Sequence, residues 1–356
     1  MQERIKGCHD IMEEKQLDAL LITSSSNRFY LSGFTGTAGN LLITSAGDNY
    51  LITDFRYTEQ AEDEAEDFEI VEITGKRQKK LAEFIAEKDI SSLGFEDDDV
   101  SYKNYRRLDE LCEGIALVPL EGDVSDLRLT KTESEIDKIV DAIRIAESAF
   151  QEILNYIEPG IKEKDIAAEL EYLLRQRGGE GPSFDFIVAS GRRSALPHGV
   201  ASDKELEKGD FVTIDFGTFY QGYCSDLTRT LILGEPEEKQ REIYELVLEA
   251  HKRAIDMIEP GMTGREADAT ARDLIEERGY GEYFGHGLGH GLGVEVHEGP
   301  KVSRESDDEL RPGMVFTDEP GIYIPDFGGV RIEDDLLLTE DGCEVLNELT
   351  KDLITL

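Results

Sequence analysis

The first third of the chain alternates short apolar runs with charged segments of helical length. The apolar runs are rich in β-branched and aromatic residues, which predicts strands, and they cover residues 17–23, 40–44, 50–54, 68–73 and 91–96. The charged segments between them predict helices at 55–66, 76–88 and 101–113. Such alternation is typical of an α/β domain. The turn-rich segment 32–39 has no GxGxxG and no phosphate-loop lysine, so nucleotide binding is not predicted.

The pattern changes near residues 125–131, where a long helix begins. Thr132 and Glu135 form the capping-box sequence T-x-x-E, which predicts a helix from there to about residue 156. Its apolar residues keep helical spacing, and they are Ile136, Ile139, Val140, Ile143, Phe150, Ile153 and Ile157. We therefore predict two domains, residues 1–127 and residues 128–356.

Two aspartates mark a predicted β-hairpin in the second domain. The hairpin sequence is GDFVTIDFGTFYQGYCSDLTR, with Gln221 and Gly222 as turn residues. Cross-strand partners then have residue numbers that add up to 443, as 221 and 222 do. This register places Asp226 on the same face as Asp215, one diagonal step away, or about 7–8 Å. Two buried carboxylates this close repel unless a cation lies between them, whereas two solvated aspartates need none.

A repeat within the chain favours the cation. Residues 205–217 align without a gap on 309–321, and residues 157–178 align on 258–279, at offsets of 104 and 101. Two matches at nearly one offset predict a duplicated unit of two helices followed by a β-hairpin. The alignment places Glu319 where Asp215 stands, and Glu333 roughly where Asp226 stands. The predicted fold class of this domain is therefore α+β with a pseudo-twofold duplication that brings four carboxylates together.

Charge and composition exclude several partners. The chain has 78 acidic and 38 basic residues, a formal net charge of −40, so we expect it to bind neither nucleic acid nor anionic membranes. Because salt screens such self-repulsion, a salt-adapted source is a reasonable hypothesis. No apolar run approaches the ~18 residues that span a bilayer, and the charged start is no signal peptide; we expect a cytoplasmic protein. The four cysteines are scattered, which predicts neither a disulfide framework nor a thiolate zinc site.

Four of the six histidines lie in glycine-, proline- or turn-rich surroundings, where functional side chains are often displayed. They are His198, His286, His290 and His297. His251 lies on a charged helical segment, and we predict that it is a surface residue. The pair His286 and His290 has the spacing of a helical zinc pair, but the intervening glycines oppose a helix and the zincin glutamate is absent. A glycine-rich strand that lets the backbone approach a metal or a substrate fits better.

Four carboxylates with one imidazole suit a pair of divalent ions such as Mn²⁺, with Co²⁺ or Zn²⁺ able to substitute. Two ions about 3.5–4 Å apart can share a water, lower its pKa and polarise a carbonyl. Histidines outside the metal shell can stabilise an oxyanion or move protons. These parts suit amide hydrolysis, although phosphoester hydrolysis would use similar ones.

The whole chain resembles a known family. Its motifs LPHG, DFGTFYQGYCSDLTRT, HGLGHGLGVEVHE, TDEPGIYI and VRIEDD are similar to those of the metal-dependent Xaa-Pro peptidases, aminopeptidase P and prolidase, which have the pita-bread fold. The N-terminal sequences NRFYLSGFTGTAG and LITDFRYTEQA also resemble that family's N-terminal domain. The family's metal ligands fall, without substitution, on Asp215, Asp226, His290, Glu319 and Glu333.

The resemblance also implies roles around the metals. Glu319 would take the proton from the bridging water, and His198 and His297 would hydrogen-bond the substrate around the scissile bond. His286 and Arg331 would support substrate or ligands. The resemblance implies two divalent ions, proline-containing peptides as substrates, and a homodimer formed through the N-terminal domain.

Within the family, two activities stay open. A dipeptidase must bind the substrate's terminal carboxylate, normally with a basic side chain, and Lys301 could do this, although a surface lysine is as plausible. The sequences SGFTGTAG and TDFRYTEQA favour Xaa-Pro aminopeptidase, with Xaa-Pro dipeptidase as the alternative. The complete ligand set disfavours a metal-free reaction like that of creatinase, and also a non-catalytic binding protein. The separate N-terminal domain disfavours a methionine aminopeptidase.

Overall fold

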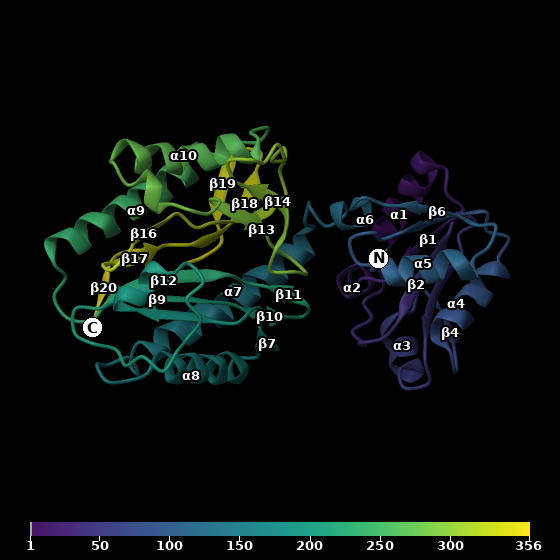
Figure 1. Cartoon of the computed structure of the whole chain (residues 1–356), viewed down its shortest axis with the longest axis horizontal. Helices are drawn as coiled ribbons and strands as arrows, with labels where there is room; N and C mark the ends of the chain where they lie inside the picture. The colour runs from purple at the N-terminus through teal and green to yellow at the C-terminus, as the bar shows by residue number, and fades with distance from the viewer. Residues whose placement is uncertain (1) are drawn as a thin grey trace. The chain divides into compact units, whose positions relative to one another are not determined.

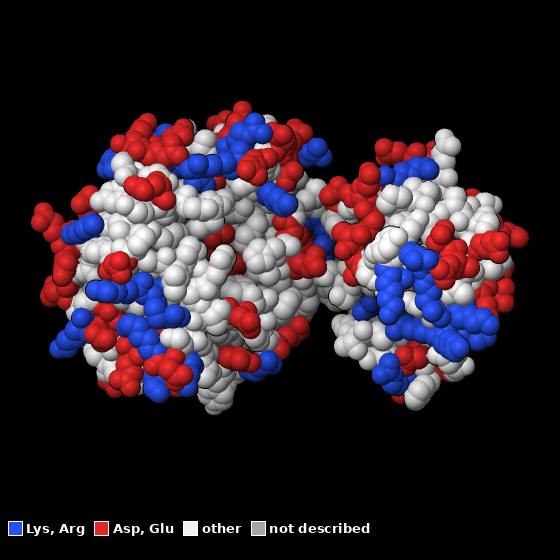
Figure 2. Space-filling view, viewed as in Figure 1, with Lys and Arg blue, Asp and Glu red and all other residues white. Residues whose placement is uncertain are grey.

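The computed structural model describes residues 2–356, and the chain divides between Arg128 and Leu129 into two compact units (Figure 1). Acidic side chains are spread over both units, and Lys and Arg gather on one face of the N-terminal unit (Figure 2). No helix of the described residues is apolar over a length sufficient to span a bilayer.

The N-terminal unit is built around a mixed six-stranded sheet in the order β4-β3-β2-β1-β5-β6. Its strands are β1 Ala19–Ile22, β2 Asn40–Thr44, β3 Asn49–Thr53, β4 Glu69–Glu72, β5 Ser92–Phe95 and β6 Ala116–Pro119. Its helices are α1 Gln2–Lys15, α2 Ser25–Ser32, α3 Thr58–Glu64, α4 Arg77–Ala86, α5 Tyr102–Leu111 and α6 Asp123–Asp126. The five predicted strands and three predicted helices are all present, so the α/β prediction is confirmed. Helices α1, α2 and α6 and strand β6 were not predicted from the sequence.

The C-terminal unit contains two similar halves. The first half comprises α7 Glu133–Ile153, α8 Glu163–Gln176, β7 Gly181–Pro182, β8 Ile187–Ser190, the 3₁₀ helix η1 Gly191–Ala195, β9 Phe211–Phe216, β10 Thr218–Tyr220, β11 Tyr223–Cys224 and β12 Leu227–Ile232. The capping box of Thr132 and Glu135 is present, but α7 ends at Ile153, three residues before the predicted end.

The second half also begins with two helices that are followed by strands, and it extends to the last residue of the chain. It comprises α9 Glu238–Met257, α10 Gly264–Glu277, η2 Gly281–Tyr283, β13 Gly289–Gly291, β14 Glu298–Val302, β15 Val315–Asp318, β16 Gly321–Ile324, β17 Gly328–Arg331, β18 Asp334–Thr339, β19 Gly342–Val345 and β20 Ile354–Thr355. Helices α9 and α10 lie on one side of the strands and α7 and α8 on the other (Figure 1). Each pair packs on its own apolar core.

Equivalent contacts close the two halves, which confirms the duplication. An isolated bridge joins Lys162 to Glu205 in the first half, and Thr263 to Glu309 in the second. The flanking hydrogen bonds also match: Gly160 N to Leu206 O and Gly261 N to Leu310 O are both 2.8 Å. The offsets of 101 and 104 residues in the sequence are therefore offsets between equivalent positions in space.

Each half carries one long hairpin with a constant register. In the first hairpin Phe216 pairs with Leu227 and Tyr220 with Tyr223, so the predicted sum of 443 is confirmed from end to end. The turn residues Gln221 and Gly222 have φ values of 48° and 77°, the positive values that a type I′ turn requires. In the second hairpin the sum is 652, from the Val315–Leu337 pair to the Ile324–Gly328 pair. Both strands of each hairpin are interrupted partway along, between β9 and β10, β11 and β12, β15 and β16, and β17 and β18, and the acids described next lie at or beside these interruptions.

Candidate metal centre

Four acidic side chains come together from the two hairpins. Asp215 lies in β9 and Asp226 immediately before β12, while Glu319 follows β15 and Glu333 precedes β18. Asp215, Asp226 and Glu333 are buried and Glu319 is partly buried. Three of the four acids lie where a strand is interrupted, so their backbones leave the regular pleat where the side chains meet. The predicted gathering of four carboxylates is thus present.

His290 approaches these acids on β13, and glycines on both sides make the approach possible. A Cβ at position 289 would lie 1.9 Å from the carbonyl oxygen of Thr317, and one at position 291 would lie 1.9 Å from that of Gly299. Any side chain at either position would therefore push β13 away from its neighbours. The predicted glycine-rich strand is confirmed, and His286 lies in the loop before it rather than on a shared helix.

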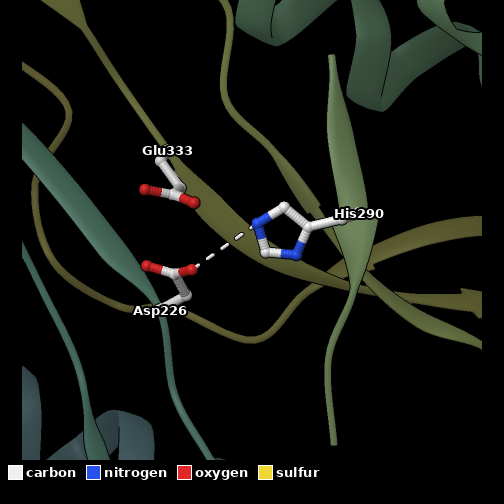
Figure 3. A group of neighbouring side chains, drawn as sticks. All are labelled: Asp226, His290 and Glu333. Atoms are coloured by element: carbon white, nitrogen blue, oxygen red, sulfur yellow. Dashed lines mark ion pairs between the residues drawn. The ribbon is translucent and has the colours of Figure 1, made fainter. Parts of the chain in front are cut away.

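The ligand atoms converge on one small volume. Asp226, His290 and Glu333 each offer one atom such that all three atoms lie within 4.8 Å of one another, and their side chains point toward one another (Figure 3). Nε2 of His290 is 3.7 Å from Oδ2 of Asp226 and 3.5 Å from Oε1 of Glu319. Asp215 joins the group through Arg331, which donates a hydrogen bond to its carboxylate and places Nε 3.9 Å from Oε2 of Glu319.

The protonation of these groups shows how unfavourable the cluster is for protein atoms alone. Burial, followed by repulsion from Glu333 and Asp215, raises the pKa of Asp226 well above its usual value. Burial and repulsion from Glu319 do the same to the pKa of Glu333, and burial raises the pKa of Glu319 to about 8. Burial also lowers the pKa of His290 to about 4, so this imidazole is neutral at pH 7.

This donor set fits divalent metal ions. Buried oxygens of Asp215 and Asp226, Oδ1 in each, have no hydrogen-bond partner within the described chain. Buried carboxylates whose oxygens lack donors need a cation, and a neutral imidazole beside them is a ligand rather than a counter-charge. Oxygen-rich sites with one nitrogen suit ions such as Mn²⁺.

A further layer of side chains fixes the ligands in place. The hydroxyl of Thr228 donates to Glu333, and the backbone N–H of Asp226 donates to Asp335 at 3.3 Å. Thr317 contacts two ligands, because its hydroxyl accepts from the backbone N–H of His290 at 3.1 Å and donates to Glu319 at 3.4 Å. Such outer contacts orient the ligand atoms before a metal arrives.

His251 is part of this support, and the prediction that it lies on the surface was wrong. Its imidazole is fully buried, with Nδ1 2.8 Å from Asp318 and Nε2 3.0 Å from Asp334. These two aspartates face each other across β15 and β18, and each is the chain neighbour of a ligand. Although burial opposes it, the attraction of Asp318 and Asp334 raises the pKa of His251 to about 9. His251 therefore holds two repelling acids together beside the metal ligands.

A cavity of about 420 Å³ opens above the acids. It is lined by the five predicted ligands together with His198, His286, His297, Arg331, Phe184, Asp185, Ile187, Pro197, Val200, Gly287 and Gly289. The ring of His297 lies 4.3 Å from that of His290, measured between centroids. The structure therefore places every predicted ligand, and five of the six predicted catalytic or substrate-binding residues, at one cavity.

Lys301 is the exception. Its backbone pairs with His290 across β13 and β14, but its side chain is exposed and is not among the cavity residues. The register slips between His290 and Gly291, so β14 does not follow β13 with regular alternation. The structure thus gives no support to Lys301 as a substrate-binding residue.

Tyr323 is a site residue that the sequence analysis missed. Its buried hydroxyl lies 2.8 Å from Nε2 of His286 and accepts a hydrogen bond from Arg331 at 2.9 Å. It therefore joins two predicted substrate-binding residues into one network. The available signal was strand alternation, because Tyr323 lies two residues after Gly321 in a strand that faces Arg331.

Comparisons with known proteins agree with this geometry. Residues 137–340 match metallopeptidase family M24, and residues 4–130 match the creatinase/prolidase N-terminal domain. The Xaa-Pro dipeptidase of Pyrococcus horikoshii is 45% identical over 99% of both chains. The structure of an Xaa-Pro dipeptidase from Bacillus anthracis has a TM-score of 0.97 and 50% identity, covering 100% of this chain and 99% of its own. The X-Pro aminopeptidase structure from Thermotoga maritima has a TM-score of 0.91 and 43% identity, covering 98% of this chain and all of its own. The chain therefore belongs to metallopeptidase family M24, with the pita-bread catalytic domain and the N-terminal domain of its Xaa-Pro peptidases.

Proposed function

We propose that this protein is a metal-dependent Xaa-Pro dipeptidase, which hydrolyses the amide bond that precedes proline in a dipeptide. The convergence of Asp226, His290 and Glu333 beneath a histidine-lined cavity carries this proposal. The sequence motifs favoured an aminopeptidase, with the dipeptidase as the alternative. The relatives favour the alternative, because curated and structural relatives with up to 50% identity are named Xaa-Pro dipeptidases. The Thermotoga maritima relative keeps Xaa-Pro aminopeptidase as the second candidate.

The five predicted ligands would hold two divalent ions per chain. We propose Mn²⁺, with Co²⁺ or Zn²⁺ able to replace it, because four carboxylates and one imidazole form a mainly hard-oxygen donor set. When bound, such ions would polarise the substrate carbonyl and lower the pKa of an attacking water.

The protein's own groups would handle the proton and the substrate. Glu319 is the least buried of the four acids, and it borders the cavity, so we assign it the proton from the attacking water. His297 lies against His290, where it can donate to the carbonyl oxygen of the scissile bond. Both His286 and Arg331 are hydrogen-bonded to the hydroxyl of Tyr323, and this network would shape the wall beside the substrate.

With Lys301 outside the cavity, another hydrogen-bond donor would receive the carboxylate of a dipeptide. Arg331 is already bonded to Asp215, whereas His198 and His297 are exposed at the cavity. We propose that His198 receives the terminal carboxylate, because hydrogen bonds to a charged acceptor are the strong ones. A homodimer formed through residues 1–127 and a cytoplasmic location stay predictions from the sequence.

Substrate length decides between the two candidate activities. The metal-stripped protein is reconstituted separately with Mn²⁺, Co²⁺ and Zn²⁺, and release of the first residue from Ala-Pro and from Ala-Pro-Ala is compared. We expect efficient cleavage of Ala-Pro and slow cleavage of Ala-Pro-Ala. The variant Glu319→Gln should lose about 10²-fold or more in kcat while keeping the fold. Preferential cleavage of Ala-Pro-Ala would establish the aminopeptidase, and cleavage of neither peptide would overturn the proposal.

A further inference from the structure

A buried carboxylate at the start of α8 has no part in the metal centre. Glu163 is fully buried, and its two oxygens accept hydrogen bonds from Ser190, Arg193 and Ser202. The backbone N–H and the hydroxyl of Ser190 both donate to Oε1 at 2.8 Å. The backbone N–H and the hydroxyl of Ser202 donate to Oε2 at 3.1 and 2.6 Å. A carboxylate surrounded by donors in this way is a strong and rigid junction.

The residues that Glu163 binds lie at the two ends of one chain segment. Ser190 ends β8 and Ser202 lies twelve positions later, and residues 191–201 between them are called here the His198 segment. Arg193, inside the segment, donates from Nε to Glu163 at 3.0 Å and from Nη2 to the carbonyl of Val200 at 2.7 Å. Glu163 therefore joins the two ends of the His198 segment. Through Arg193 it also fixes the backbone at Val200.

The His198 segment forms one wall of the cavity. Pro197, His198 and Val200 all line it, and the carbonyl of Pro197 accepts a hydrogen bond from Arg331 at 3.2 Å. His198 itself is exposed, and its ring makes no side-chain hydrogen bond within residues 2–356. Its position therefore depends on the backbone of its segment, which is where Glu163 acts.

The duplication shows that the pita-bread scaffold does not require this carboxylate. At the offset of 101, the position equivalent to Glu163 is Gly264 in the second half, at the start of α10. A Cβ there would lie 2.1 Å from the carbonyl oxygen of Lys301 and 2.7 Å from Oγ of Ser306, and both distances are too short for a carbon atom. The second half thus closes its equivalent loop by direct backbone contact, with no room for a side chain. The second half therefore holds its own loop, which carries the cavity histidine His297, without a carboxylate at this position.

We propose that Glu163 is a positioning residue for substrate binding, which holds the His198 segment so that His198 meets the substrate. The expected change in KM rests on the proposed peptidase function, whereas the expected loosening of the His198 segment does not. Glu163 touches no cavity residue that we assign to metal or to proton transfer, so its loss should weaken substrate binding and leave the metal centre intact.

The variant Glu163→Gln tests this, since it keeps the size of the side chain but loses the charge and turns one acceptor into a donor. Its matched control is Asp165→Asn, the same kind of change at an exposed position in the same first turn of α8. Hydrogen exchange of the Mn²⁺-loaded protein should rise about tenfold or more in residues 191–201 for Glu163→Gln, and stay at the wild-type rate for Asp165→Asn. Mn²⁺ affinity, measured by calorimetry, should be unchanged in both variants.

Kinetics separate positioning from general stability. For Ala-Pro, Glu163→Gln should raise KM about tenfold or more, the factor of one hydrogen bond to a charged group, with kcat within about twofold. Glu163→Asp, which keeps the charge, should recover part of that loss. Adding His198→Ala to Glu163→Gln should cost less than the product of the two single effects, because the residues act through one segment.

Two outcomes would overturn the proposal. One is wild-type exchange in residues 191–201 of Glu163→Gln. The other is a loss of Mn²⁺ affinity together with faster exchange throughout the C-terminal unit, which would make Glu163 a general stabilising group. If the wild type cleaves no Xaa-Pro peptide, the proposed function fails, while the exchange experiment still decides whether Glu163 holds the segment.

Discussion

Replacing His251 with leucine should destabilise the C-terminal unit more than almost any other single change away from the ligands. His251 lies between Asp318 and Asp334, at 2.8 and 3.0 Å, and all three side chains are buried. When His251 is removed, Asp334 still has Arg229 and Lys351 as ion-pair partners, at 2.8 and 2.6 Å. Asp318 has no other cation within ion-pair distance among the described residues, so leucine would leave it buried against a second carboxylate.

The structure sets the size of the effect. Removing one partner of a buried ion pair costs about 3–5 kcal/mol, because the remaining charge is left without compensation. That is a large share of the roughly 5–15 kcal/mol by which folded proteins are stable. For a unit of this size, 1 kcal/mol moves the thermal midpoint by about 2–4 °C, so His251→Leu should lower the midpoint by roughly 6–20 °C.

The measurement is calorimetry or far-UV circular dichroism of the Mn²⁺-loaded protein, because the chain has no tryptophan to report by fluorescence. His9→Leu is the control, the same chemical change at a half-buried histidine of the N-terminal unit, and it should move the C-terminal transition by less than about 1 °C, since the change lies in the other unit. If His251→Leu unfolds within about 1 kcal/mol of the wild type, the ion-pair reasoning is refuted.

Three further predictions follow. The pKa of His251 rises from 6.5 to about 9 on folding, so its contribution to the free energy of unfolding is complete below pH 6.5 and is lost as the pH rises through 9. Urea titrations of the Mn²⁺-loaded wild type at increasing pH should show the free energy of unfolding fall by up to about 3 kcal/mol, and His251→Gln should show a smaller dependence on pH. Chelation with EDTA should abolish peptidase activity and lower the free energy of unfolding by about 4 kcal/mol relative to protein in Mn²⁺ at 1,000 times its Kd; an unchanged unfolding midpoint would contradict metal binding at the buried acids. Tyr323→Phe removes the hydroxyl shared by His286 and Arg331 and should lower kcat/KM about tenfold with Mn²⁺ affinity retained, whereas a loss of bound Mn²⁺ would place Tyr323 among the supports of the ligands.

The ligand cluster was predictable because its information is local and repeated. A two-residue turn at Gln221 and Gly222 fixes the register of the first hairpin, and register fixes which side chains share a face. The internal alignment then transfers the acidic position from Asp215 to Glu319 without knowledge of the fold. Glycines around His290 indicated a strand rather than a helix, and the close contacts at positions 289 and 291 give the reason.

The wrong prediction, for His251, concerns long-range contacts. His251 looked solvent-exposed because its helical neighbours in the sequence are charged, yet Val247 and Ala254, four positions before and three after it, are both fully buried. That spacing places His251 on the buried face of α9. Only the fold shows that Asp318 and Asp334 lie against that face. Lys301 was suggested with a surface lysine as an equal alternative, and in the structure its side chain is exposed and does not line the cavity.

The two-half construction has a consequence for how the centre could be assembled. Asp215 and Asp226 belong to the first half, and His290, Glu319 and Glu333 to the second, while each half has its own pair of helices. The two are joined in the chain by the short connection 234–237, whose two glutamates are exposed. A protein nicked there would consist of two fragments that each hold an incomplete set of ligands, and Mn²⁺ would favour their reassociation by bonding to both.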